Sequence, residues 1–143
     1  MELFTVGYEG RTLPQLVRLL EEHGIGRLVD VRERPYSRRK GFSATPLSEA
    51  LRKAGIVYEP GFGLGNPDDI RSMWKRGELD VGKRKYRAFL RNGRRERVEY
   101  VVALADLGPV ALLCLEGDAG DCHRSVIAEE AVRLDPRVTV RHL

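Results

Sequence analysis

The stretch GPVALLCLEG, residues 108–117, decides the fold class of this chain. Its apolar run, Val110–Leu115, is short and is bounded by glycine and proline, which is typical of a strand rather than a helix. An apolar run without polar alternation indicates a strand that is covered on both faces, as at the centre of a parallel sheet. The stretch therefore predicts a sheet with helices on both sides.

Strand-like and helix-like segments alternate on either side of this run. The sequence predicts further strands at Leu3–Tyr8, Arg27–Val31, Ile56–Glu59 and Val138–His142. Apolar residues recur every three or four positions between them, and Thr12 with Gln15 predicts a capping box at the first helix. The alternation predicts a single-domain, three-layer α/β/α fold over residues 1–143, with a mostly parallel sheet of about five strands.

The composition is that of a globular protein without a membrane segment. Apolar residues make up 42% and charged residues 32% of the chain, and no apolar run is long enough to span a membrane. A strand follows Met1 almost at once, so we expect no signal peptide. The chain has two cysteines, which favours free thiols in the cytoplasm over a disulfide framework. The excess of arginine over lysine fits a thermophile or a GC-rich genome.

Positive charge is concentrated in two segments, although the net charge is only +4. Residues 83–97 contain eight Lys or Arg and one acidic residue, and residues 32–40 contain five and one. Such clusters predict an anionic partner, either nucleic acid or a phosphorylated small molecule. Tyr86 and Phe89 lie three positions apart and predict a stripe that faces the core, so a solvated basic face is the competing interpretation.

Polar residues follow the C-terminal ends of the expected strands, where open parallel sheets bind their ligands. The sequence therefore predicts one site at this edge of the sheet. Its candidate residues are Tyr8 and Arg11 after the first strand, Asp30, Arg32, Ser37 and Arg38 at the second, and Cys114, Glu116, Cys122, His123 and Arg124 at the central one.

Cys122 is the main candidate for a nucleophile. We expect Asp121 to cap the last helix, which would place Cys122 in a first turn whose free N–H groups stabilise a thiolate. Successive helical residues point about 100° apart, so His123 would act on Glu116 or Asp30 rather than on Cys122. The competing interpretation is a buried thiol on the inner face of the helix.

The other candidates also have two interpretations each. Cys114 lies within the apolar run and reads as a core cysteine. Glu116 follows on the same side of the strand, either as a general base or as an ion-pair partner of Arg32. Asp30 and Arg32 share one side of the second strand, where they either pair with each other or face the site.

No cofactor is predicted, and no residue is assigned as a metal ligand. Cys114, Cys122 and His123, together with Glu116, form a mixed set of ligand types. Their spacing matches no closed zinc motif, so a bound zinc ion is only the alternative to a site without metal. Motifs for phosphate binding are missing as well: the chain has no P-loop, neither cysteine is followed by arginine six positions on, and the glycines of residues 60–67 lack the dinucleotide spacing.

Three sequence blocks carry a family resemblance. They are TVGYEGR at residues 5–11, LVDVRERPYSR at residues 28–38, and the CLE and CHR motifs between Cys114 and Arg124. In these blocks the chain resembles the bacterial and archaeal family known as domain of unknown function number 488. The resemblance implies a shared site at the strand ends, made of the candidate residues named above, and it implies no particular substrate.

The sequence supports an enzyme that acts on nucleic acid or on a nucleotide-like phosphorylated substrate. In this hypothesis Arg32, Arg38 and Arg124 bind anionic groups, and Tyr8, Arg11 and Ser37 complete the substrate site. Cys122 is the nucleophile, or Glu116 or Asp30 is a general base, and His123 assists proton transfer.

Two other functions stay open. One is a non-catalytic nucleic-acid-binding module that uses the basic residues of 83–97. The other is an interaction protein in which the cysteine and histidine residues are only structural.

Overall fold

Strands and helices alternate along the whole chain in the computed structural model, which describes residues 1–143. The strands are β1 (Glu2–Gly7), β2 (Arg27–Asp30), β3 (Val57–Pro60), β4 (Val110–Cys114) and β5 (Thr139–His142). The helices are α1 (Leu13–Glu22), α2 (Ala44–Lys53), α3 (Asp68–Lys75), α4 (Leu79–Arg91), α5 (Arg95–Leu107) and α6 (Arg124–Leu134), and a 3-10 turn, η1 (Ala119–Asp121), precedes α6. None of the helices has the length and apolar character needed to cross a membrane.

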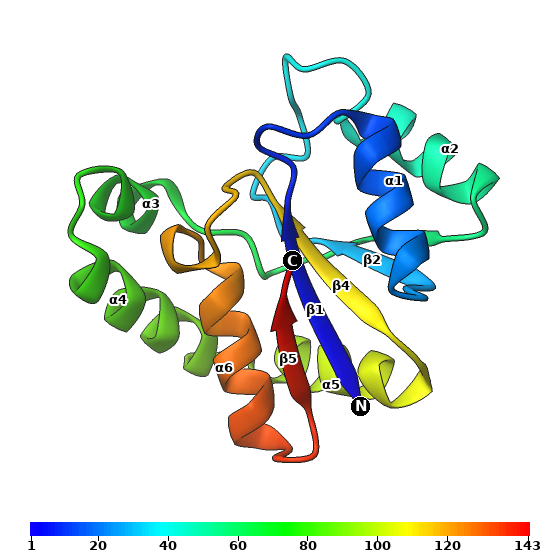
Figure 1. Cartoon of the computed structure of the whole chain (residues 1–143). Helices are drawn as coiled ribbons and strands as arrows, with labels where there is room; N and C mark the ends of the chain where they lie inside the picture. The colour runs from blue at the N-terminus through cyan, green and yellow to red at the C-terminus, as the bar shows by residue number, and fades with distance from the viewer.

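The strands form one sheet in the order β3-β2-β4-β1-β5, and all neighbouring pairs are parallel (Figure 1). β4 lies at the centre, hydrogen-bonded to β1 on one edge and to β2 on the other. All five of its residues are buried, because strands flank β4 on both edges and helices cover both faces of the sheet. The predicted α/β fold, the parallel sheet and the doubly covered central strand are confirmed.

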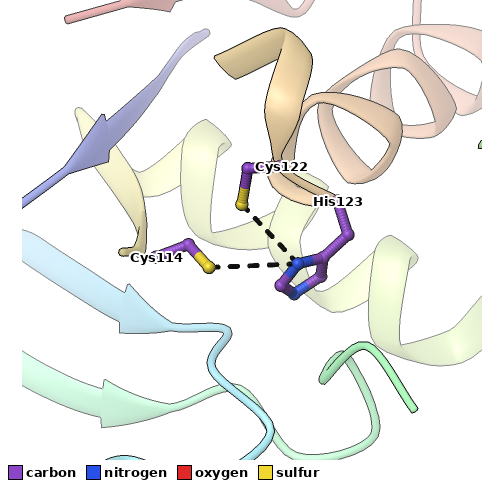
Figure 2. Close-up of side chains that lie close together, drawn as sticks. All are labelled: Cys114, Cys122 and His123. Carbon is purple, nitrogen blue, oxygen red and sulfur yellow. Dashed lines mark hydrogen bonds between the residues drawn. The ribbon is translucent and has the colours of Figure 1, made fainter. Parts of the chain in front are cut away.

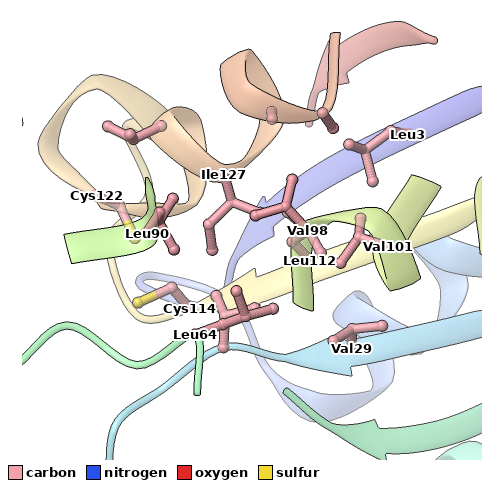
Figure 3. Close-up of a cluster of buried hydrophobic side chains, with 14 of the residues drawn as sticks. Leu3, Val29, Leu64, Leu90, Val98, Val101, Leu112, Cys114, Cys122 and Ile127 are labelled. Carbon is pink, nitrogen blue, oxygen red and sulfur yellow. The ribbon is translucent and has the colours of Figure 1, made fainter. Parts of the chain in front are cut away.

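The two faces of the sheet carry separate hydrophobic clusters. Ala111 and Leu113 of β4 pack with α1 and α2 on one face. Val110, Leu112 and Cys114 alternate with them and pack with α4, α5 and α6 on the other face (Figure 3). Cys114 is therefore a core residue, as its sequence context predicts, and it lies on the same face as α6.

Helix α6 begins later than predicted. The Asp118 side chain accepts a hydrogen bond from the Gly120 N–H and closes the η1 turn, which ends at Asp121. Cys122 then has extended backbone angles, φ −132° and ψ 143°, and His123 is the N-cap. The prediction that Asp121 caps the helix and that Cys122 lies in its first turn is wrong. Cys122 therefore receives no stabilisation from free N–H groups of that turn.

Glu130 of α6 connects this helix to α4. Its carboxylate accepts hydrogen bonds from Arg91 and Arg133, and Arg87 lies 3.3 Å away. Burial alone raises the pKa of Glu130, but the hydrogen bonds from Arg91 and Arg133 outweigh it and leave the pKa below its ordinary value. A carboxylate whose pKa is lowered by folding stabilises the protein above its unfolded pKa, and this stabilisation disappears as the pH falls.

We expect Glu130→Gln to lower the free energy of unfolding by about 2 kcal/mol at neutral pH. The difference from wild type should stay constant above about pH 5.5 and shrink as the pH falls further, because the wild-type carboxylate is protonated below its unfolded pKa and through its lowered native pKa. Urea unfolding at several pH values measures this. Glu129→Gln is the matched control, since its side chain is 53% exposed and should change little. A difference that stayed constant as the pH fell below about 5.5 would contradict the assignment.

Candidate functional site

A cavity of about 410 Å³ opens at the C-terminal ends of the strands, where parallel sheets hold ligands. Its size is that of a site for a small molecule. The wall combines two thiols and an imidazole, three carboxylates and four cations. These residues are Cys114, Cys122, His123, Glu33, Glu116, Asp121, Arg32, Arg34, Arg71 and Lys75.

Cys114, Cys122 and His123 converge although they come from different elements. Cys114 ends β4, Cys122 precedes α6, and all three side chains are buried. The Nδ1 atom of His123 lies 3.6 Å from the Cys122 Sγ and 3.9 Å from the Cys114 Sγ (Figure 2). We predicted that His123 points away from Cys122; that prediction is wrong because Cys122 is extended rather than helical.

The imidazole of His123 has a fixed orientation. Its Nε2 atom lies 2.7 Å from the carbonyl oxygen of Val31 at the end of β2. Because a carbonyl oxygen only accepts hydrogen bonds, Nε2 carries the proton, and the lone pair of Nδ1 faces the two sulfur atoms. The ring of Tyr86 packs edge-on against the imidazole, with the ring centroids 5.1 Å apart.

Cys114 is a neutral thiol. Its hydrogen bond with Cys122 and its burial raise the pKa of Cys114 well above the ordinary value, and His123 lowers it only in part. The Cys114 Sγ donates a hydrogen bond to the Glu116 Oε2 at 3.2 Å. These contacts disfavour the thiolate of Cys114, which is the reactive form of a cysteine.

Glu116 presents a carboxylate without a cationic partner. It is half-buried in the cavity wall, two residues after Cys114, as the strand spacing predicts. The ion pair with Arg32 that the sequence left open is not formed, because the Arg32 guanidinium is taken up by Asp30. A carboxylate in this situation is free to accept a proton from a bound molecule.

Asp30 and Arg32 form a buried ion pair beneath the cavity. The Arg32 Nε and Nη2 atoms donate to the two carboxylate oxygens of Asp30 at 2.9 and 2.7 Å. The Tyr58 hydroxyl donates to the same carboxylate at 2.6 Å, and burial together with this bond raises the pKa of Tyr58. Arg32 reaches the cavity wall, but Asp30 does not. The ion pair, one of the two interpretations that the sequence left open for Asp30 and Arg32, is thus formed.

Four of the expected substrate-binding residues also lie outside the cavity wall. Arg124 is fully buried and donates to the backbone carbonyls of Glu116 and Gly117, so it holds the loop after β4 rather than an anionic ligand. The other three are Arg11, which donates to the Gly7 carbonyl, Ser37, which accepts from the Arg39 N–H, and the exposed Arg38. Tyr8 and Arg32 do line the cavity, as predicted.

Most of the residues that line the cavity lie in a region that matches a known family. The family model described as "Domain of unknown function DUF488" matches residues 12–131. The chain belongs to the DUF488 family. Neither a curated protein nor a solved structure matches it. The DUF488 match confirms the family resemblance, and it includes the second and third sequence blocks and the Cys114, Cys122 and His123 cluster.

Part of the cavity wall of this DUF488 protein was not predicted from its sequence. Helix α3 and the loop before it contribute Asn66, Arg71, Trp74 and Lys75, and Tyr36 comes from the loop after β2. The spacing of Arg71 and Lys75, four residues apart on a helix, is a signal for one cationic face. That spacing does not indicate which part of the sheet the helix covers.

Glycines bring the loop of residues 60–67 close to the end of β2. A Cβ atom on Gly65 would lie 2.2 Å from the Glu33 Oε2, and one on Gly61 would lie 2.8 Å from the Asp30 carbonyl oxygen. Glycine at these two positions therefore permits the loop to pack closely against the end of β2. The following Asn66 is buried, and its Oδ1 has no hydrogen-bond partner.

The basic segment 83–97 does not contribute to the cavity wall. Tyr86 is buried and Phe89 packs against the core, as their spacing predicts. Ion pairs with acidic residues occupy Arg87, Arg91 and Arg95. These ion pairs therefore neutralise part of the positive charge of the segment.

Proposed function

We propose that this DUF488 protein is an enzyme that hydrolyses a nucleotide-like phosphorylated substrate in the strand-tip cavity. The observation that carries the proposal is the presence of unpaired groups of both signs in one wall. Arg71 and Lys75 form no ion pair, and the Glu116 carboxylate contacts only the Cys114 thiol. Cations bind phosphate, and a free carboxylate can activate water.

Aromatic and amide groups in the wall favour a nucleotide over a bare phosphate. Tyr36 is 70% exposed and lines the cavity, so it offers a surface on which a base can stack. Asn66 lines the cavity as well and contributes a side-chain amide to the wall, with its Oδ1 fully buried. The cavity volume suits a single nucleotide.

The reaction that fits these groups is attack of water on phosphorus. The oxygen of the water forms a bond to phosphorus, and the Glu116 carboxylate accepts the proton that the water loses. The ester P–O bond breaks, and the leaving oxygen takes a proton from solvent at the mouth of the cavity. Arg71 and Lys75 stabilise the negative charge on the phosphoryl oxygens.

Cys122 is the competing candidate for the attacking group. Its Sγ lies 3.6 Å from the unprotonated Nδ1 of His123, an arrangement in which imidazole can accept the thiol proton. This route forms a phosphocysteine, whereas attack by water forms no covalent intermediate. Mass spectrometry of rapidly quenched enzyme distinguishes the two routes.

We expect Glu116→Gln to lower kcat by a factor of about 100 or more, because the general base is lost. Arg71→Ala should raise KM about tenfold, because it removes a charge-assisted bond to phosphate. The assay is phosphate release from a panel of nucleoside monophosphates. The control is Glu49→Gln on the exposed surface of α2, which should leave both parameters unchanged. A wild-type protein that neither binds nor hydrolyses any member of the panel would contradict the proposal.

A second function, nucleic-acid binding by residues 83–97, is favoured by the charges that the ion pairs leave free. The free cations are Lys83, Arg84, Lys85, Arg94 and Arg97. Such a surface predicts binding of a single-stranded oligonucleotide that weakens steeply with salt. Charge reversal at Arg94, Arg95 and Arg97 should abolish that binding and leave phosphate release intact.

A further inference from the structure

We propose that Cys114, Cys122 and His123 bind a zinc ion in the wall of the cavity, with a fourth coordination position open to the cavity. The three side chains are buried, and their potential ligand atoms all lie within 4.8 Å of one another. They come from the end of β4 and from the segment that enters α6 (Figure 2). The sheet topology therefore gathers the ligands, which the sequence spacing alone does not indicate.

The separations of the ligand atoms fit one tetrahedral ion. With zinc–sulfur bonds of about 2.3 Å and zinc–nitrogen bonds of about 2.0–2.1 Å, a sulfur and a nitrogen ligand lie about 3.5–3.6 Å apart. The Nδ1 atom of His123 lies 3.6 Å from the Cys122 Sγ and 3.9 Å from the Cys114 Sγ. These two separations fit one ion, and binding also requires the two sulfur atoms, which lie within 4.8 Å of each other, to come to about 3.8 Å apart.

The second ring nitrogen of His123 is held as in zinc proteins. A ligating histidine donates its other N–H to a carboxylate or a backbone carbonyl, which fixes the ring and its tautomer. Here the Nε2–H donates to the Val31 carbonyl at 2.7 Å. The lone pair of Nδ1 is therefore directed at the sulfur atoms before any ion binds.

The chemistry of the three ligands favours zinc over magnesium and calcium. Two thiolates and an imidazole form a soft donor set, which disfavours magnesium and calcium. On binding, each thiol loses its proton to solvent and forms a bond to the ion, and no electron is transferred. The two thiolates balance the charge of the ion, so a neutral unit replaces the thiols within the buried cluster.

Three protein ligands and one open position are the pattern of a catalytic zinc site rather than a structural one. Glu116 lies in the same wall, with its Oε2 3.2 Å from the Cys114 Sγ. From there its carboxylate can accept a proton from a water molecule at the fourth position. This role of Glu116 rests on the proposed function, whereas the zinc site itself does not.

The test measures metal content and cobalt spectra of the full-length protein. Reduced protein is stripped with a chelator, loaded with zinc or cobalt, and freed of excess metal. We expect one zinc per chain by elemental analysis, and a sulfur-to-cobalt charge-transfer band that Cys114→Ser and Cys122→Ser each weaken. Because loss of an outer partner alone lowers metal affinity about 10–100-fold, loss of a ligand should lower it more than about 100-fold.

Glu116→Gln is the matched control, since it changes the same wall without removing one of the three ligands and should still bind one zinc. Circular dichroism shows whether the cysteine variants fold; if they do not, the cobalt spectrum of the wild-type protein decides. Wild-type protein with no bound zinc and no charge-transfer band would overturn the proposal. A Cys114–Cys122 disulfide that forms instead of a metal complex, or zinc retained by the Cys114→Ser/Cys122→Ser double variant, would also overturn it.

The outcome is distinguishable from that of the proposed function. If the protein releases phosphate but binds no zinc, the proposed metal site is overturned and the proposed hydrolase activity is supported. If the protein binds zinc but hydrolyses no nucleoside monophosphate, the metal site is supported and the proposed substrate class is overturned.

Discussion

Replacement of Asp30 by asparagine is expected to lower the free energy of unfolding by about 3–5 kcal/mol. The Asp30 side chain is fully buried, and that of Arg32 is only 6% exposed. Without the carboxylate, the Arg32 guanidinium stays buried with no opposite charge. Asparagine keeps one acceptor oxygen in place of two, so it cannot accept all the hydrogen bonds that Arg32 and Tyr58 donate to Asp30. Removing one member of a buried ion pair costs far more than the pair contributes, because desolvation of the remaining charge is then uncompensated.

Asp68→Asn is the matched control for Asp30→Asn. Asp68 also forms two hydrogen bonds with one arginine, Arg34, but these side chains are 65% and 66% exposed. Water compensates the loss of such a pair, so the expected change is below about 1 kcal/mol. Urea unfolding at neutral pH measures both variants, and equal effects would show that burial of the Asp30 pair is not decisive.

Gly7→Ala is expected to lower the free energy of unfolding by about 3 kcal/mol or more and to abolish the proposed phosphate release. A Cβ atom on Gly7, at the end of β1, would lie only 1.8 Å from the carbonyl oxygen of Glu116. The obstacle is backbone, so either β1 or the loop after β4 has to move. The same carbonyl accepts a hydrogen bond from the buried Arg124, and its movement displaces the Glu116 carboxylate from the cavity wall.

Gly26→Ala provides the control for Gly7→Ala. Gly26 precedes β2, is exposed, and has no atom within 4 Å of an added Cβ. Its replacement should change the free energy of unfolding by no more than about 0.5 kcal/mol and leave activity unchanged. A Gly7→Ala protein as stable and as active as Gly26→Ala would contradict the role of close packing at the strand ends.

Local sequence signals predicted most of the fold. The apolar run of β4 is continuous because helices cover both faces of that strand, and the capping box of Thr12 and Gln15 begins α1 as expected. The proximity of Cys114 and Glu116 was also predictable, since residues two apart in an extended chain point to the same side. These features depend on neighbours within a few residues.

Features that depend on tertiary packing could not be predicted in this way. The contact between Cys122 and His123 requires the η1 turn, which Asp118 closes before α6 begins. The sequence also left open whether Asp30 and Arg32 pair with each other, and the ion pair is visible only in the folded structure. The position of α3 over the strand ends follows from a loop whose glycines pack on Glu33 and Asp30, which no local pattern indicates.

The most direct measurement of the central claim is a titration of isotope-labelled protein with nucleoside monophosphates, followed through the backbone amide resonances. If the strand-tip cavity is the substrate site, the resonances that shift belong to residues 114–123 and to Asn66–Lys75, and Arg71→Ala weakens the binding. Shifts confined to the basic residues of 83–97, unchanged by Arg71→Ala, would contradict the account and assign the anion-binding function to helices α4 and α5.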